Sequence, residues 1–206
     1  MILMSSISKD QLQLVKNLYY LNELPMKKVA ETLGVSLDAV TYYMRHNNLK
    51  RRTRKEDSIL RFKNKPLSFE INKKLSTYEE KLKVIGVTLY WGEGYKTKKS
   101  AGVDLANSDV SMILIFLSFL RKVCGVDENR LRVLLYCHSN QDTRQLVHFW
   151  SKKTKIPVTQ FSKPYVRKNV HYDSIHTMPY GLVHIRYADK KLLQVIMDWI
   201  EEYKVM

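Results

Sequence analysis

The chain has 206 residues, of which 35 are Lys or Arg and 20 are Asp or Glu, so its formal net charge is +15. This length allows one or two domains, and a hydrophobic fraction of 45% is ordinary for a globular core. The strongly basic balance predicts a polyanionic partner. It favours DNA or RNA over a membrane surface as the partner, because the chain contains no apolar run of 18 residues.

The two cysteines, Cys124 and Cys137, do not have the spacing of metal ligands, and we expect both to be reduced core thiols. The first residues lack the charged and apolar regions of a signal peptide. Together these features predict a cytoplasmic or nucleoid-associated protein.

Helical patterns fill residues 1–66, which we expect to form a small all-α domain with a basic tail. Residues 26–43 resemble a helix-turn-helix, in which aliphatic side chains form a small core between two helices. Gly34 would supply the turn and Ser36 would cap the second helix. A generic helical hairpin is the alternative interpretation.

The second helix of this motif would turn a set of side chains toward a major groove. The expected groove residues are Leu37, Thr41, Tyr42 and Arg45. The expected phosphate contacts come from the basic stretch that follows, which we interpret as a hinge or tail ending at Pro66: Lys50, Arg51, Arg52 and Arg54.

A third helix is predicted from a capping box at residues 77–80 to Glu93. Its last part is uncharged and apolar, and then Glu93 stands alone between Gly92 and Gly94, where Gly94 would be a left-handed helix stop. A carboxylate in such a setting usually has a cation or a metal as a partner. Glu93 is therefore a candidate metal ligand, and an ion pair with Lys96 is the alternative.

The rest of the chain alternates between strand and helix patterns. The expected strands are residues 101–107, 131–138, 158–163 and 182–187, the expected helices are 109–123, 142–154 and 189–202, and residues 164–180 are expected to be a polar loop. Polar side chains on one face of these strands are candidate base readers, or the ordinary wet face of a half-covered sheet. The candidate base readers are Arg132, Tyr136, His138, Gln160, His184 and Arg186, and the candidate phosphate contacts are Lys163, Arg167 and Lys168.

Residues 86–94 resemble the nine-residue signature of the LAGLIDADG homing endonucleases. Leu89 matches the central leucine, and Gly92-Glu93-Gly94 matches the final small-acid-glycine triplet. Thr88 replaces the family's early glycine, and Trp91 stands at its first acidic position. The element order after residue 77 follows the family's order of helix, two strands, helix, two strands and helix, with one extra helix. The resemblance implies an α+β fold, with a LAGLIDADG-like domain at residues 77–206.

In that family the signature helices of two units pack together, and the terminal acids hold divalent metal at the scissile phosphates. The resemblance implies a dimer interface at Thr88 and Gly92, and a homodimer because the chain has one copy of the motif. It also implies a Mg²⁺ or Mn²⁺ site at Glu93 and the Gly92 carbonyl, with Lys96 and Lys98 as candidate catalytic cations.

Three functions fit these features. The first is a metal-dependent, sequence-specific DNA endonuclease, which Glu93 favours. The second is a DNA-binding transcription regulator on a degenerate LAGLIDADG scaffold, a combination that a bacterial sporulation-regulator family also shows. Trp91 and the helix-turn-helix favour this second function. The third is an RNA-binding splicing helper.

Overall fold

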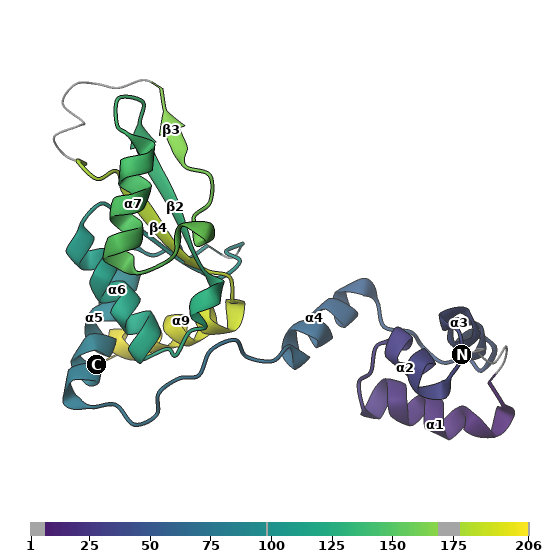
Figure 1. The fold of residues 1–206 in the computed structure, drawn as a ribbon. Helices are drawn as coiled ribbons and strands as arrows, with labels where there is room; N and C mark the ends of the chain where they lie inside the picture. Colours follow the sequence, from purple (N-terminus) through teal and green to yellow (C-terminus); the bar gives the residue numbers. More distant parts are fainter. Residues whose placement is uncertain (1–6, 98, 169–177, 206) are drawn as a thin grey trace. The chain divides into compact units, whose positions relative to one another are not determined.

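The computed structural model describes residues 7–97, 99–168 and 178–205 (Figure 1). The chain divides after Pro66 into two compact units, and its fold class is α+β. Within the described ranges, no helix is both long enough and apolar enough to cross a membrane.

The first unit is built from helices around a small core. Its elements are a 3₁₀ turn Lys9–Gln11, α1 Leu12–Lys16 with a π-helical continuation Asn17–Leu21, α2 Met26–Leu33, α3 Leu37–His46 and α4 Arg54–Asn64. The small aliphatic core predicted between the two helices is present: Val29, Val35 and Val40 are buried, and Leu33 packs against them partly buried. Gly34 ends α2 with φ +67°, and the Ser36 hydroxyl accepts a hydrogen bond from the Ala39 amide at 3.1 Å, so both of these local predictions are confirmed.

Helix α4 corrects the prediction of a basic hinge or tail. Thr53 and Glu56 form a capping box, in which each side chain accepts a hydrogen bond from the other residue's backbone amide. The hydrogen bond from the Thr53 amide to the Glu56 carboxylate lowers the pKa of this carboxyl. This helix was not predicted because the segment is rich in Arg and Lys, and charge alone does not distinguish a solvated helix from a flexible segment.

In its described residues, the second unit packs four α-helices and a four-stranded sheet around one core. The helices are α5 Thr77–Glu93, α6 Val110–Lys122, α7 Thr143–Thr154 and α9 Lys190–Lys204. The strands are β1 Val103–Asn107, β2 Leu131–His138, β3 Tyr165–Arg167 and β4 Leu182–Tyr187. The strand order is β1-β4-β2-β3, antiparallel except for the parallel pair β2 and β3. α5 begins one residue earlier than expected in its capping box, since Ser76 is the N-cap and Glu79 its partner.

The two faces of this sheet differ. Alternate residues such as Leu105, Val133 and Ile185 are fully buried in the core that the helices share. The opposite face, here called the open face, carries the polar and aromatic residues of the alternation. It consists of Asp104, Ala106, Arg132, Leu134, Tyr136, His138, Tyr165, Arg167, Leu182, His184 and Arg186.

Two segments of this unit differ from the sequence prediction. Residues 158–163 form a 3₁₀ turn, Val158–Gln160, and only one isolated bridge, from Phe161 to Val133, where a strand was predicted. The predicted loop 164–180 contains β3, and its residues 169–177 lie outside the described part. Strand β1 begins at Val103, two residues later than predicted, and the preceding Gly102 lies against the end of β4, where a Cβ atom would meet the Tyr187 carbonyl at 2.3 Å.

Candidate functional site

Glu93 is the last residue of α5, and its side chain is exposed. Among the residues that the structure describes, none forms an ion pair or a side-chain hydrogen bond with it. Gly94 then continues in extended conformation, with φ −77° and ψ 149°, so the prediction of a left-handed stop is wrong. A glycine is needed there for a different reason: a Cβ atom would lie 2.5 Å from the Tyr90 carbonyl oxygen.

Lys96 closes the end of the same helix. Its ammonium donates to the carbonyls of Trp91 at 2.9 Å and Gly94 at 2.7 Å. A cation at this position offsets the partial negative charge of the helix end. Lys96 is therefore not the partner of Glu93, and its role as a catalytic cation stays a prediction. Lys98 lies outside the described residues.

Tyr90 is buried beneath this turn and holds it from inside. Its hydroxyl donates to the Tyr95 carbonyl at 2.8 Å, and burial raises the pKa of the phenol to about 12. The turn is also joined to the sheet, since Gly94 pairs with Leu105 and the Tyr95 amide donates to the Asp104 carbonyl at 2.9 Å. Glu93 thus lies next to the edge strand β1.

The outer face of α5 is apolar and exposed. Val84, Ile85 and Trp91 keep 51%, 45% and 39% of their surface in solvent. Thr88 is also exposed, and a Cβ atom at Gly92 would meet nothing within 4 Å. Gly86 belongs to the opposite face, where a Cβ atom would collide with the Phe119 ring at 2.2 Å. The sequence did not distinguish these glycines, one of which packs α5 on α6 while the other is open.

An acidic residue joins two predicted base readers on the open face. The Asp104 carboxylate lies 2.8 Å from His184 Nδ1 and accepts a second bond, also at 2.8 Å, from Arg186 Nε. Asp104 was not among the predicted site residues. Its place on the polar side of the β1 alternation was the signal that could have identified it.

A pocket of about 560 Å³ lies on the open face. Four aromatic or imidazole rings and one cation are prominent in its wall: Tyr95, Tyr136, Tyr165, His184 and Arg167. His138 also lines it and is 5% exposed, and its Nδ1 is a buried atom with no partner in the described structure. His138 and His184 are therefore buried in the wall of this pocket, and their role as base readers stays a prediction.

The other sequence-predicted residues of this unit divide into two groups. Lys163, Arg167 and Lys168 are exposed. Arg132 is exposed as well, although one of its terminal nitrogens donates to the Asn129 carbonyl at 2.7 Å. Gln160 is buried, and its amide donates to the backbone carbonyls of Glu128 and Leu131 at 2.8 and 2.7 Å. The prediction that Gln160 reads bases is therefore wrong, because its donors are used inside the fold.

In the first unit, α3 exposes most of the predicted groove residues. Tyr42 is 68% exposed, and its ring stacks on His46 with centroids 5.9 Å apart. Leu37 and Arg45 are exposed, and Thr41 is half-buried, with its hydroxyl donating to the Leu37 carbonyl at 2.9 Å. Three of the four predicted phosphate contacts are also exposed: Lys50, Arg51 and Arg54.

Arg52 is the exception, and the prediction that it contacts phosphate is corrected. Its guanidinium lies 3.9 Å from the centre of the Tyr19 ring and donates to the carbonyls of Tyr19 and Leu24. It also forms an ion pair with Asp57 at 2.8 Å. Arg52 therefore attaches α4 to the rest of the first unit.

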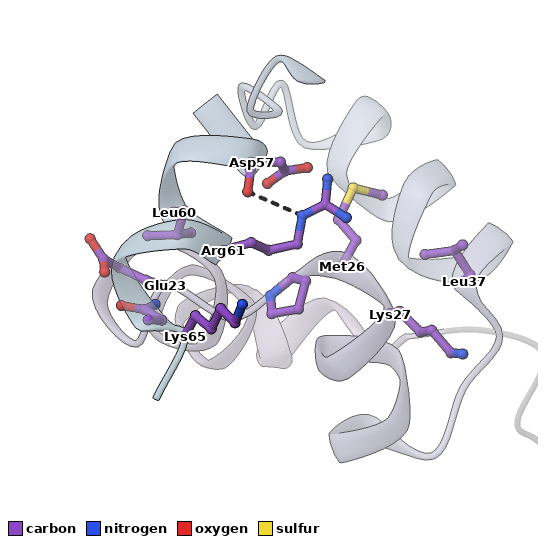
Figure 2. Close-up of a pocket in the computed structure, with 10 residues that line it drawn as sticks. Glu23, Met26, Lys27, Leu37, Asp57, Leu60, Arg61 and Lys65 are labelled. Atoms are coloured by element: carbon purple, nitrogen blue, oxygen red, sulfur yellow. Dashed lines mark hydrogen bonds between the residues drawn. The ribbon is translucent and has the colours of Figure 1, made fainter. Parts of the chain in front are cut away.

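Figure 2 shows a second pocket, of about 540 Å³, within the first unit. Met26, Leu37 and Leu60 give it apolar walls, and charged residues surround them. Arg61 is held over it by a hydrogen bond from Nε to the Asp57 carbonyl at 3.3 Å. The predicted groove residue Leu37 thus also borders a cavity that was not predicted from the sequence.

The described residues hold no group of three or more His, Cys, Asp or Glu side chains arranged for a metal ion. A divalent ion at Glu93 would therefore need ligands from a second chain or a phosphate, a donor set that Mg²⁺ accepts since it binds through one or two carboxylates plus phosphate. No protein-family model, curated protein or solved structure matches this chain.

Proposed function

We propose that this protein is a sequence-specific double-stranded DNA-binding protein of the LAGLIDADG type, which cleaves DNA as a homodimer with Mg²⁺ or Mn²⁺. The observation that carries the proposal is Glu93, an exposed carboxylate without a cation partner among the described residues, at the end of a helix with an exposed apolar face. A solvent-facing run of Val, Ile and Trp is unusual for a helix in a monomer and is typical of an interface.

The first unit would supply one DNA-reading module. Tyr42 and Arg45 on α3 would lie in the major groove, as the second helix of a helix-turn-helix does. The exposed Arg51 and Arg54 would contact phosphates and hold the register of the helix on the duplex. This assignment is supported by the Ser36 cap of α3, the left-handed Gly34 and the exposure of these side chains.

The second unit would supply a further DNA-binding surface and the cutting site. Lys163, Arg167 and Lys168 would contact phosphates beside the open face. The link between Gly94 and Leu105 keeps Glu93 next to β1, so that one bound duplex could reach both the sheet and the carboxylate.

A homodimer would bring two copies of Glu93 together. Val84, Ile85 and Trp91 would be buried between two α5 helices, and Thr88 and Gly92 would let the backbones approach. Closed twofold symmetry would then match two half-sites of a partly palindromic target.

In this dimer each Glu93 would hold a divalent ion together with the scissile phosphate, and the Gly92 carbonyl would be a further ligand. The ion, when bound, lowers the pKa of a water molecule and offsets charge on the leaving oxygen. Lys96 would act by fixing the helix end and hence the direction of Glu93, because its ammonium is bound to the last carbonyls of α5.

A non-cleaving DNA-binding regulator is the second candidate. It is favoured by Trp91, which stands where the family signature has an acid, and by the absence of a three-ligand metal group among the described residues. In that case Glu93 would have no catalytic role, and the α3 surface would carry the function.

The test begins with the whole protein and a library of random duplexes, from which a binding site is selected and placed in a supercoiled plasmid. Affinity for the site should fall with salt, with a slope on the order of −5 to −10 in log–log form for about 6–10 phosphate contacts. Nicking or linearisation with Mg²⁺ and none with EDTA supports the nuclease. Binding without nicking in Mg²⁺ or Mn²⁺ supports the regulator, and a slope near zero contradicts both.

A further inference from the structure

Four rings form a continuous row along the open face. The Tyr95 and His184 rings are 5.6 Å apart between centroids, His184 and Tyr136 are 5.0 Å apart, and Tyr136 and Tyr165 are 5.0 Å apart. The two ends of the row, Tyr95 and Tyr165, are 49% and 58% exposed. Unpaired nucleobases stack on exposed aromatic rings of this kind in proteins that bind single strands.

The pocket beside this row contains an unpaired buried nitrogen. His138 is almost fully buried, and its Nδ1 has no partner among the described residues. Leaving such an atom unsatisfied is costly, so it needs an explanation of its own. A ligand in the pocket that offers a hydrogen-bonding edge would satisfy it.

A second imidazole in the wall has a fixed orientation. Because the Asp104 carboxylate can only accept, the 2.8 Å contact assigns the proton to His184 Nδ1 when the ring is neutral. His184 Nε2 is then an acceptor on the ring that lines the pocket. The imidazole nitrogens of the pocket can form hydrogen bonds with the edge of a nucleobase, and its tyrosine rings can stack on the face of the same base. Proteins recognise unpaired bases through these two kinds of contact.

The charges near the pocket fit a nucleic acid strand. Arg167 lines the pocket, and Lys163 and Lys168 are exposed on the same segment of chain. Among the described residues, the carboxylate in direct contact with the row is Asp104, which is occupied by His184 and Arg186. Phosphates on either side of a bound base would therefore meet cations.

We propose that this pocket binds one unpaired nucleobase, taken from a single strand, a bulge or a flipped position, with the base stacked on Tyr165 and Tyr136. A paired base could not enter in this way, since its faces are covered by its neighbours and only its edges reach a groove. The volume of about 560 Å³ lies within the range of small-molecule sites. This inference rests on the proposed binding of nucleic acid but does not depend on cleavage.

The experiment compares a fluorescent DNA duplex with the same duplex carrying a one-nucleotide bulge, bound to the whole protein and followed by anisotropy. The bulged duplex should bind about tenfold tighter, and Tyr165→Leu should remove that difference because base–ring stacking has this magnitude. Tyr165→Phe keeps the ring and should keep the difference. Tyr78→Leu is the matched control, since Tyr78 is also 58% exposed and lies outside the pocket.

A 5-iodouracil at the bulge gives an independent signal, because light couples it to a stacked aromatic ring. We expect the cross-link on Tyr165 or Tyr136, and repeating the binding with RNA of the same sequence shows which kind of strand is preferred. Equal affinity for paired and bulged duplexes, or an unchanged preference in Tyr165→Leu, would overturn the inference while leaving duplex binding intact. Failure to bind the paired duplex at all would instead contradict the proposed function.

Discussion

Gly94 pairs with Leu105 in an antiparallel bridge, and this pairing fixes the end of α5 against the edge strand β1. The helix end is held on two further sides, by the Tyr90 hydroxyl from inside and by the Lys96 ammonium from outside. The position of Glu93 is therefore set by the fold and not by a mobile loop. A carboxylate that binds an ion together with a phosphate must be held in a fixed position of this kind.

The close approach at Gly94 predicts a large difference between two neighbouring glycines. Gly94→Ala should lower the free energy of unfolding by about 1–3 kcal/mol, because its methyl group would lie 2.5 Å from the Tyr90 carbonyl. Gly92→Ala is the control and should be neutral or slightly stabilising when both variants are compared as monomers at low protein concentration, since nothing in the chain lies within 4 Å of its Cβ position and alanine favours a helix. Urea unfolding of the two variants measures this, and equal stabilities would contradict the geometry.

Substitutions of the adjacent residues Arg51 and Arg52 should have different effects, one on DNA binding and the other on the stability of the first unit. Arg52→Ala removes the ion pair with Asp57 and leaves two carbonyls without their donor, so it should destabilise the first unit by on the order of 2–4 kcal/mol. Arg51→Ala should change stability by less than about 0.5 kcal/mol and lower the salt slope of DNA binding by about one. Thermal unfolding and salt titrations would show the pattern, and a destabilised Arg51→Ala would refute it.

The proposed dimer can be tested on the outer face of α5. Gly92→Leu should convert a dimer to a monomer, because a bulky side chain would separate the two helices where the surface is now open. The stability of the monomeric unit should stay close to that of the parent, since nothing in the chain lies within 4 Å of the Cβ position at Gly92. Light scattering measures the mass, and a parent protein that is already monomeric on its DNA site would rule the dimer out.

Tyr90 should make the stability of the second unit depend on pH in alkaline solution. The pKa of this phenol is about 12 in the folded state, against an ordinary value of 10.0, so between these values the folded protein binds more protons than the unfolded chain. The free energy of unfolding should then fall as pH rises from 10 to 12, by at most about 1.4 kcal/mol per pH unit. Tyr90→Phe should flatten this fall, and Tyr78→Phe, which changes an exposed phenol, should leave it in place.

Local patterns predicted much of this fold because their causes are local. Alternation identified β2 and β4, and the Gly34 turn and Ser36 cap followed from backbone geometry alone. The prediction of a strand at residues 158–163 was wrong because the Gln160 side chain is bound to the carbonyls of Glu128 and Leu131. These partners are distant in the sequence, and a local alternation of polar and apolar residues does not reveal them. The sequence singled out Glu93 but not the Asp104–His184 contact, which joins residues 80 positions apart.

The candidate pocket was not predicted from the sequence because its residues come together only through distant contacts. Tyr95 follows a helix, Tyr165 lies in a segment that was expected to be a loop, and only the pairing of β3 with β2 brings Tyr165 beside Tyr136. Arg52 was misassigned because a basic run does not show which of its members turns inward to an aromatic ring.

The central claim is that Glu93 holds a catalytic metal ion, and Glu93→Gln tests it most directly because this change keeps the shape of the side chain and removes its charge. Nicking of a supercoiled plasmid carrying the selected site should be slowed by on the order of 10²-fold or more with Mg²⁺ or Mn²⁺. Affinity for the same DNA should be equal or slightly higher, since one negative charge near phosphate is lost. A Glu93→Gln protein that nicks at the parent rate, or a parent that binds the site and never nicks it in either metal, would contradict the account.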